Sequence, residues 1–268
     1  MFRDITLGQY YPAGSVIHKL DPRVKLLGTL LYIISLFAFG KVFNYIAAAV
    51  FLGIIIFLSK VPVKFMVKGL RAIFILMLIT AAFNLFLTPG TTVAQIWKLK
   101  ITAEGIRVAV LMVVRLVLLV MGSSIMTLTT TPNDLTDGLE KGLGFLKKIR
   151  VPVHEIAMMM SIALRFIPIL IEETDKIMKA QSARGADFDS GNIIQRAKSL
   201  IPILVPLFIS AFRRANDLAM AMEARGYHGG EGRTKMRPLV YHKKDYLAYL
   251  VIALYLAVMV VIRIRMPR

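Results

Sequence analysis

Five long apolar runs constrain the fold of this chain more than any other feature of its sequence. They cover residues 24–39, 42–59, 71–88, 105–131 and 246–261. A helix of about 20 apolar residues is long enough to cross the hydrocarbon core of a bilayer. Hydrophobic residues make up 57% of the chain, which is too many for an ordinary soluble domain. The sequence therefore predicts an all-α membrane protein with about five transmembrane helices.

The formal net charge of +18 bears on the orientation of these helices. Lys and Arg collect in the cytoplasmic loops of membrane proteins, so the basic connection between the second and third runs is expected inside. No compact motif that reads RNA or DNA is present, and we expect no nucleic-acid partner. Five spans from an inside amino terminus would place the basic residues 263–268 outside, against the same rule. Either a surface helix spans as well, or the larger basic regions outweigh the tail.

Two arginines lie within the fourth apolar run. Arg107 and Arg115 are eight residues apart, so they lie roughly on one helical face. Arg107 is close enough to the end of the run to extend its charge to the membrane surface. Arg115 lies deeper, where a carbonyl or a lipid headgroup is the expected partner, and we assign it no catalytic role.

Residues that would support catalysis or metal binding are missing from the sequence. The chain has no cysteine, which excludes disulfides and thiolate sites. It has no Gly-rich loop with Gly-Lys-Ser/Thr for ATP phosphates, and its four histidines share no ligand spacing. No carboxylate pair lies within an apolar run, which argues against a proton relay. We therefore expect no catalytic residue, no metal site and no directly bound cofactor.

Three segments of different character follow one another along the chain. Residues 1–131 are predicted to hold the first four transmembrane helices, and residues 245–268 the last one with its tail. Residues 132–244 are rich in charged residues. We expect them to form a cytoplasmic coupling domain of short and long kinked helices.

This central segment is predicted to contain one short helix and two long ones. The short helix starts at Pro132, because proline is favoured at the first helical position. The long helices are expected over residues 152–184, with a kink at Pro168, and over residues 193–225. Each begins with an apolar half, which could be mistaken for a span. Arg165, the internal prolines and the charged second halves favour helices along the inner membrane surface.

Both long helices are predicted to end on the same tripeptide, Ala-Arg-Gly. Its two copies, offset by 41 positions, are Ala183-Arg184-Gly185 and Ala224-Arg225-Gly226. Glycine just past the last turn adopts the left-handed conformation without penalty. Arginine in the last turn faces the partial negative charge of the helix C-terminus. One copy is explained as a helix stop, whereas two copies favour a pair of fixed cationic tips that suit carboxylates on a partner.

On these residues the chain resembles the transmembrane T component (EcfT) of energy-coupling factor transporters. These are vitamin and metal importers of the ATP-binding-cassette type. The resemblance covers essentially the whole chain. It is carried by the two tripeptides and by two further motifs, Leu20-Asp21-Pro22-Arg23 and Leu164-Arg165-Phe166-Ile167-Pro168.

The resemblance implies a scaffold in the cell membrane of a prokaryote rather than an enzyme. Two cytoplasmic ABC ATPase subunits would dock on the long helices, with Arg184 and Arg225 inserted into acidic grooves, and ATP would bind in those subunits. A separate S component would bind the vitamin and pack on the apolar surface of the same helices. Our candidates for that surface are Met158, Met159, Met160, Ile167 and Ile203. The alternative for each of them is core packing or lipid contact.

Two other functions remain open on the sequence. One is a T component dedicated to cobalt or nickel uptake, with a fixed metal-binding partner. The other is a membrane scaffold or channel outside transport, which would form no stable complex with ATPases; it ranks low because rows of pore-lining polar residues are absent.

Overall fold

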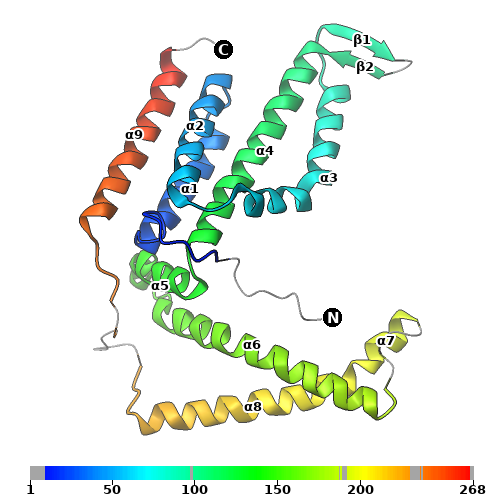
Figure 1. Cartoon of the computed structure of the whole chain (residues 1–268), viewed down its shortest axis with the longest axis vertical. Helices are drawn as coiled ribbons and strands as arrows, with labels where there is room; N and C mark the ends of the chain where they lie inside the picture. Colours follow the sequence, from blue (N-terminus) through cyan, green and yellow to red (C-terminus); the bar gives the residue numbers. More distant parts are fainter. Residues whose placement is uncertain are drawn as a thin grey trace. The chain divides into compact units, whose positions relative to one another are not determined.

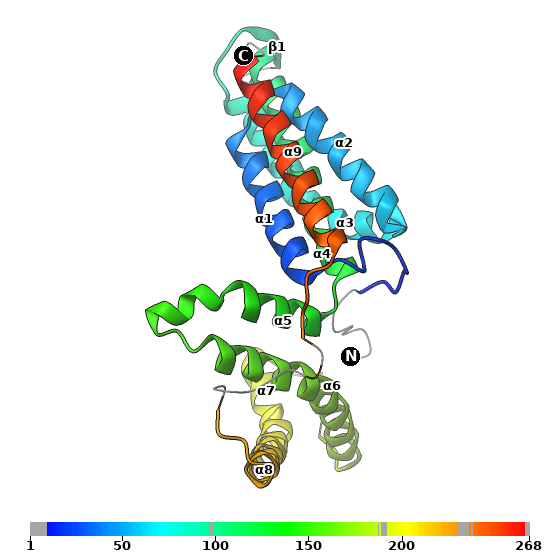
Figure 2. The same cartoon turned by 90° about the vertical axis from the view of Figure 1, so that its left-hand side faces the viewer.

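The computed structural model describes residues 10–96, 99–186, 188, 192–229, 236 and 238–265. This part of the chain is helical apart from one two-stranded hairpin (Figures 1 and 2). It divides into two compact units. We call residues 8–138 with 239–268 the bundle unit and residues 139–238 the arm unit. The sequence analysis placed the corresponding boundaries at 131/132 and 244/245.

The bundle unit consists of long helices with the hairpin between two of them. Its elements are α1 (Pro22–Ala38), α2 (Val42–Ser59), α3 (Val63–Leu87), β1 (Thr92–Ile96), β2 (Leu99–Thr102), α4 (Ala103–Thr129) and α9 (Lys243–Arg265), with most of α5 (Pro132–Gly142). Helices α1 and α2 pack on both α4 and α9, and α3 packs along α4. The arrangement confirms the predicted all-α membrane fold.

Five helices of the described chain are long and apolar enough to cross a membrane, namely α2, α3, α4, α6 (Val153–Ala183) and α9. This set differs from the predicted one at two places. Helix α1, which we expected to span, has 17 residues, at the lower limit of a spanning helix. Helix α6, which we expected along the surface, meets the criteria of length and composition. Its most apolar stretch has the lowest mean hydropathy of the five, 1.6 against 2.2 to 2.5.

Local signals located several helix ends correctly. Asp21 is the N-cap of α1 and accepts a hydrogen bond from the Arg23 N–H at 2.9 Å, with Pro22 at the first helical position. This is the start that Asp-Pro predicts. Helix α5 starts at Pro132, also as predicted. Helix α3 begins at Val63 rather than at Arg71, because its basic first turns continue the helix ahead of the apolar run.

The hairpin between α3 and α4 was not predicted from the sequence. Strands β1 and β2 pair antiparallel, with Thr92 opposite Thr102. Thr102 also caps α4, since its hydroxyl accepts from the Gly105 N–H at 3.0 Å and donates to the Thr88 carbonyl at 2.8 Å. A tryptophan in this polar connection is typical of an anchor at the membrane interface, but Trp97 lies outside the described residues.

The core of the bundle unit consists mainly of aliphatic and Met side chains, and three tyrosines, Tyr32, Tyr45 and Tyr255, lie among them. Tyr32 packs against Gly122, where an added Cβ would lie 2.5 Å from the Tyr32 ring. Tyr45 accepts a hydrogen bond from the Arg115 Nε at 2.8 Å. The deep arginine of α4 therefore has a tyrosine hydroxyl as its partner, rather than the carbonyl or headgroup expected from the sequence.

The arm unit contains four helical elements. They are the 3₁₀ helix η1 (Gly144–Ile149), α6 (Val153–Ala183), α7 (Ile193–Ser199) and α8 (Ile201–Ala224). The first long helix was predicted correctly, and it continues through Pro168. The second was expected to be continuous and is instead divided at Leu200, because Pro202 has no N–H to donate and favours the first turn of a new helix.

Candidate coupling site

The end of α6 is formed by a left-handed glycine. Gly185 has φ +89°. Its N–H donates to the Ser182 carbonyl at 3.0 Å, and the Ala186 N–H donates to the Gln181 carbonyl, also at 3.0 Å. This pair of reversed hydrogen bonds is the Schellman motif, which satisfies the last carbonyls of a helix. Arg184 is thereby held as the C-cap residue.

The end of α8 repeats this geometry. Gly226 has φ +69°, and its N–H donates to the Glu223 carbonyl at 2.9 Å. The Tyr227 N–H donates to the Met222 carbonyl at 3.0 Å, and Arg225 is the C-cap residue. The predicted glycine helix stop is confirmed at both copies, and both copies share the two hydrogen bonds of the Schellman motif.

The two capped arginines are available to a partner. Arg184 and Arg225 are exposed, and neither forms an ion pair with the part of the chain that the structure describes. A Cβ added at Gly185 or Gly226 would have no atom within 4 Å. Glycine is therefore required there by the backbone conformation alone and not by crowding.

Helices α6 and α8 contact each other and run antiparallel across the contact (Figure 1). Near the middle, the Arg214 Nη2 donates to the Glu173 Oε2 at 2.8 Å. Nearer the end of α6, the Gln181 Nε2 donates to the Pro202 carbonyl at 3.4 Å. The C-terminal ends of α6 and α8 lie on opposite sides of their contact in Figure 1.

The ion pair at the crossing joins equivalent positions of the internal repeat. Glu173 and Arg214 are 41 positions apart, the same offset as the two tripeptides. Arg184 and Arg225 each lie 11 residues beyond their member of the pair, or about 16 Å at 1.5 Å per residue. The ion pair therefore lies the same number of residues from each of the two arginines.

Sequence reasoning did not assign this role to Glu173. In the sequence, Glu172, Glu173 and Asp175 are most simply interpreted as a solvated acidic face, whereas the Glu173 side chain is 21% exposed and paired. The repeat offset was the signal that could have found it. The residues 41 positions after Glu172-Glu173 are Arg213-Arg214. Equivalent turns of the two long helices therefore carry opposite charges.

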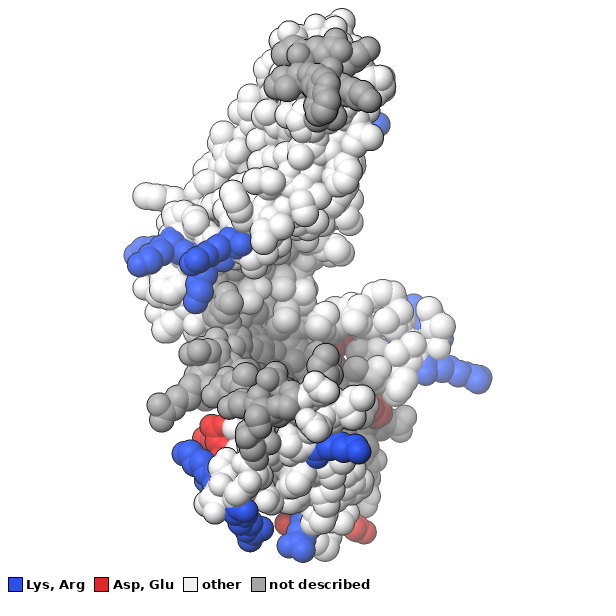
Figure 3. Space-filling view, turned by 90° about the vertical axis from the view of Figure 1, so that its right-hand side faces the viewer, with Lys and Arg blue, Asp and Glu red and all other residues white. Residues whose placement is uncertain are grey.

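The candidates for the S-component surface divide into exposed and buried residues. Met159 is 58% exposed, and Met160 and Ile167 are also exposed, while Met158 is half-buried. Ile203 is 4% exposed, so it contributes packing rather than a surface. The sequence analysis overlooked an exposed apolar stripe on α8, formed by Leu204, Phe208 and Phe212. In Figure 3 the lower part of the molecule carries charged side chains of both signs, with uncharged surface between them.

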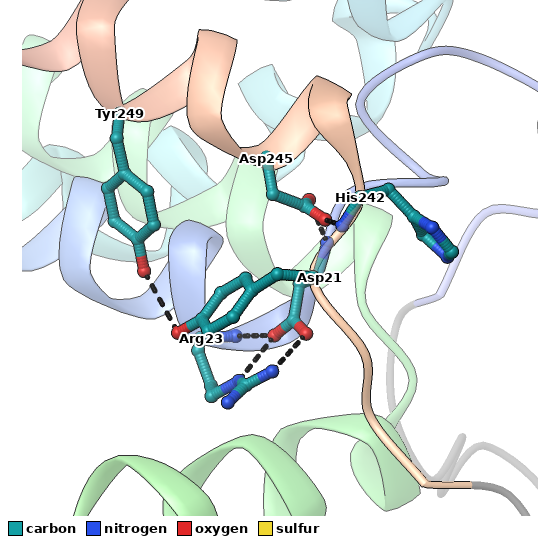
Figure 4. Close-up of polar contacts among 6 residues, drawn as sticks. Asp21, Arg23, His242, Asp245 and Tyr249 are labelled. Atoms are coloured by element: carbon teal, nitrogen blue, oxygen red, sulfur yellow. Dashed lines mark hydrogen bonds and ion pairs between the residues drawn. The ribbon is translucent and has the colours of Figure 1, made fainter.

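A polar network joins the start of α1 to the start of α9 (Figure 4). Asp245 is 1% exposed and accepts hydrogen bonds from the Asp21 N–H at 2.8 Å and the His242 N–H at 2.7 Å. The Arg23 guanidinium pairs with Asp21 at 2.8 Å and lies 3.7 Å above the centre of the Tyr241 ring. Arg23 therefore orders the junction of two helices that are far apart in sequence.

Among the described residues there is no group of three or more His, Cys, Asp or Glu side chains that could hold a metal ion.

Comparison with known proteins places this architecture in a family. The family model for cobalt transport proteins, CbiQ, matches residues 13–236. The energy-coupling factor transporter transmembrane protein EcfT of Clostridium kluyveri is 58% identical over 252 residues, which cover 93% of both chains. The proteins of the same description from Ruminiclostridium cellulolyticum and Bacillus subtilis are 54% and 47% identical, over 92% and 91% of this chain and 92% and 93% of theirs. The chain thus belongs to the CbiQ family and is a transmembrane T component of the energy-coupling factor transporter type.

Proposed function

We propose that this chain is the non-catalytic coupling subunit of an importer in the cell membrane. It would transmit the motion of two ATPase subunits to a separate substrate-binding S component. The observation that carries the proposal is the pair of identical, exposed arginine caps on opposite sides of one helix crossing. A capped arginine has a fixed position, and its planar fork suits a carboxylate groove.

Two equivalent tips suit two equivalent partners. Each tip lies about 16 Å along its helix from the crossing, so a pair of related ATPase subunits could hold one tip each in similar grooves. ATP would bind in those subunits, and this chain would hold no cofactor. Removal of one partner from a buried charge pair costs several kcal/mol, so each docked arginine contributes strongly to assembly.

The S component would pack on the exposed apolar residues of α6 and α8. Met159, Met160 and Ile167 remain candidates from the sequence, with Met158 beside them, and the stripe that includes Phe208 and Phe212 extends the surface. Flexible Met side chains adapt to several partners, which suits a subunit that serves more than one binder. Ile203 is not part of this surface because it is buried.

The crossing suggests how motion would be transmitted. When the ATPase subunits approach each other, the two tips would move relative to one another. Glu173 and Arg214 join α6 to α8. A displacement of the two tips would therefore change the orientation of one helix relative to the other. The apolar faces of these helices would pass that change to the S component.

A T component dedicated to cobalt or nickel is the second candidate function. The description of the matching family model, cobalt transport protein, supports it. The relatives with 58% and 54% identity are described as energy-coupling factor transporter proteins without a stated metal, and we therefore rank vitamin uptake first. Uptake assays with labelled cobalt and with labelled vitamins in the same cells would distinguish the two.

The test of the coupling role is a pull-down of the ATPase subunits by wild type, Arg184→Glu and Arg225→Glu, with ATP hydrolysis and vitamin uptake measured in the same preparations. Lys179→Glu is the matched control, because Lys179 is an exposed cation of α6 that lies outside the cap. We expect the two tip variants to lose ATPase binding or to hydrolyse ATP without uptake, and the control to behave as wild type. If both tip variants assemble and transport normally, Ala-Arg-Gly only ends the two helices and has no role in coupling.

A further inference from the structure

The turn between α2 and α3 and the first turns of α3 carry four cations. Lys60 is the C-cap residue of α2, and Lys64, Lys68 and Arg71 follow on α3. All four are exposed, and none forms an ion pair with the part of the chain that the structure describes. None of residues 22–103 is Asp or Glu. This stretch of the chain therefore supplies no carboxylate to balance the four charges.

The three cations of α3 lie on one face of the helix. Spacings of four and three residues separate Lys64, Lys68 and Arg71, so their side chains follow one another along one side. We call these three residues the basic face. Met66 lies on the opposite side of the helix and is fully buried. Figure 3 shows the side of the molecule on which α3 lies in Figure 1, and in its upper part Lys and Arg side chains gather in one patch without Asp or Glu among them.

The basic face lies where the chain leaves the membrane between two spans. The apolar runs 42–59 and 71–88 lie on either side of it in the sequence, and both α2 and α3 are long and apolar enough to cross a membrane. The part of α3 from residue 71 onward is already about 25 Å long, close to the thickness of the hydrocarbon core. In Figure 1 the first turns of α3 run crosswise to its later turns. These first turns therefore suit a position along the membrane surface.

Exposed apolar side chains lie beside the basic face. Val63, Val67 and Phe74 form a row along α3, and all three are exposed. On the helix this row is next to the cations and not opposite to them. A helix of this kind is typical of the membrane interface, where the apolar side chains enter the acyl region and the cations extend to the headgroups.

We propose that the basic face of α3 binds anionic phospholipid headgroups at the membrane surface. Clustered Lys and Arg beside a transmembrane helix attract lipids with a net negative charge, such as phosphatidylglycerol, more than the zwitterionic phosphatidylcholine. An acidic protein offers the same charge, but the exposed apolar row favours a lipid surface, which supplies an apolar medium next to its charges. None of these residues belongs to the proposed coupling site, so the inference does not depend on the proposed function.

The first test compares two lipids. The full chain is purified in a neutral detergent and titrated with phosphatidylglycerol or phosphatidylcholine, and native mass spectrometry counts the bound lipid. We expect preferential binding of phosphatidylglycerol, and we expect the preference to decrease as the ammonium acetate concentration rises, because salt screens exposed charges. Equal binding of the two lipids by the wild type would overturn the proposal.

Variants of the basic face locate the effect. Lys64→Gln, Lys68→Gln and Arg71→Gln are combined in one chain. Each cation near a membrane surface contributes about a factor of five, so the affinity for phosphatidylglycerol should fall roughly a hundredfold. Lys64→Arg with Lys68→Arg keeps the charge and should bind as the wild type does. Unchanged affinity in the Gln variant, or an equal loss in the Arg variant, would overturn the proposal.

A control with the same loss of charge uses three exposed cations of the arm unit, namely Lys176→Gln, Lys179→Gln and Arg213→Gln. Each of these cations has a carboxylate four residues away in its own helix, so we expect the control to bind phosphatidylglycerol as the wild type does. An equal loss in the control would mean that the net charge of the chain, and not the basic face, attracts the lipid.

The same variants distinguish a lipid from an acidic protein. Binding of the ATPase subunits is measured for the wild type and the Gln variant of the basic face, and we expect no difference between them. If the Gln variant loses these subunits but retains its affinity for phosphatidylglycerol, the basic face docks on a protein and the assignment to lipid is wrong.

Discussion

The Arg214 guanidinium donates to the Glu173 carboxylate at 2.8 Å across the contact between α6 and α8, and the same 41 positions that separate these residues separate Arg184 from Arg225. The two helices are therefore related about their crossing, with an opposite charge on each equivalent turn. A repeat whose two copies carried the same charge here would place like charges in contact, which destabilises a packed pair. The opposite charges therefore suit the contact between these two similar helices.

The first prediction concerns this pair. Glu173→Arg would place two guanidinium groups at the crossing, and Arg214→Glu two carboxylates. Because the pair is partly exposed, we expect a change in unfolding free energy of about 1 kcal/mol or less but a several-fold loss of vitamin uptake for each ATP hydrolysed. The measurement is coupled uptake in proteoliposomes that contain the whole transporter.

The charge-swapped double variant, Glu173→Arg with Arg214→Glu, is the control for that experiment. It restores an attractive pair with the opposite polarity, and we expect most of the coupling to return. If the swap is as poor as either single variant, the pair has no role in transmitting motion.

The second prediction concerns the left-handed glycines. Gly185→Ala meets no atom within 4 Å, so its effect reports the backbone conformation alone. We expect alanine to destabilise the end of α6 by about 1–2 kcal/mol, and asparagine, which tolerates this conformation better, to cost less. Amide hydrogen exchange of residues 181–186 measures this directly. Gly226→Ala should behave alike at the end of α8, and unchanged exchange at both sites would contradict the cap geometry.

The third prediction concerns the junction of α1 and α9. Asp245→Ala removes the acceptor of two backbone N–H groups, those of Asp21 and His242, in a buried position. We expect a loss of about 2–4 kcal/mol in the stability of the bundle unit, seen as a lower melting temperature. Asp217→Ala serves as the control because Asp217 is exposed on α8. Equal melting temperatures for both variants would show that the junction does not depend on Asp245.

The fourth prediction concerns pH. Burial lowers the pKa of His18 below its ordinary value of 6.5, and the ring contacts the Tyr11 carbonyl at 2.9 Å and the Ser15 hydroxyl at 2.7 Å. The folded state favours neutral His18, so the unfolded state binds more protons at acidic pH. Stability from this group is therefore present above about pH 6.5 and is lost as the pH falls through the lower pKa of the folded protein.

His18→Gln removes this titration while it retains a hydrogen-bonding side chain. We expect the slope of melting temperature against pH between about 5 and 7 to become shallower in this variant. An unchanged slope would mean that protonation of His18 does not contribute. The other three histidines remain in the variant and provide the internal reference.

Structural features that depend on short-range interactions could be predicted from the sequence. The glycine stops at Gly185 and Gly226 and the N-cap at Asp21 were all predicted, because each depends on the conformational preference of one or two residues. The membrane class followed from the length of the apolar runs. The break between α7 and α8 also depends on local sequence, and the position of Pro202 was sufficient to predict it. The long amphipathic pattern of this segment predicts one continuous helix, and Pro202 interrupts it.

Long-range placement was decided by the tertiary structure. Ile203 and Leu204 are neighbours in an apolar stretch, and only the packing of α8 determines that the first is buried and the second exposed. Asp245 accepts a hydrogen bond from the backbone N–H of Asp21, which lies 224 positions earlier in the chain, and no local pattern links the two. The same holds for the packing of Tyr32 against Gly122.

By itself, the sequence determined which segments are helices, where most of them end and which two ends are alike. The tertiary structure decided which charges meet, which apolar residues remain exposed and which helices pack together. The physical reason is the range of the forces involved. Helix caps and apolar length act within a few residues, whereas burial and charge pairing depend on elements that meet only after the chain has folded.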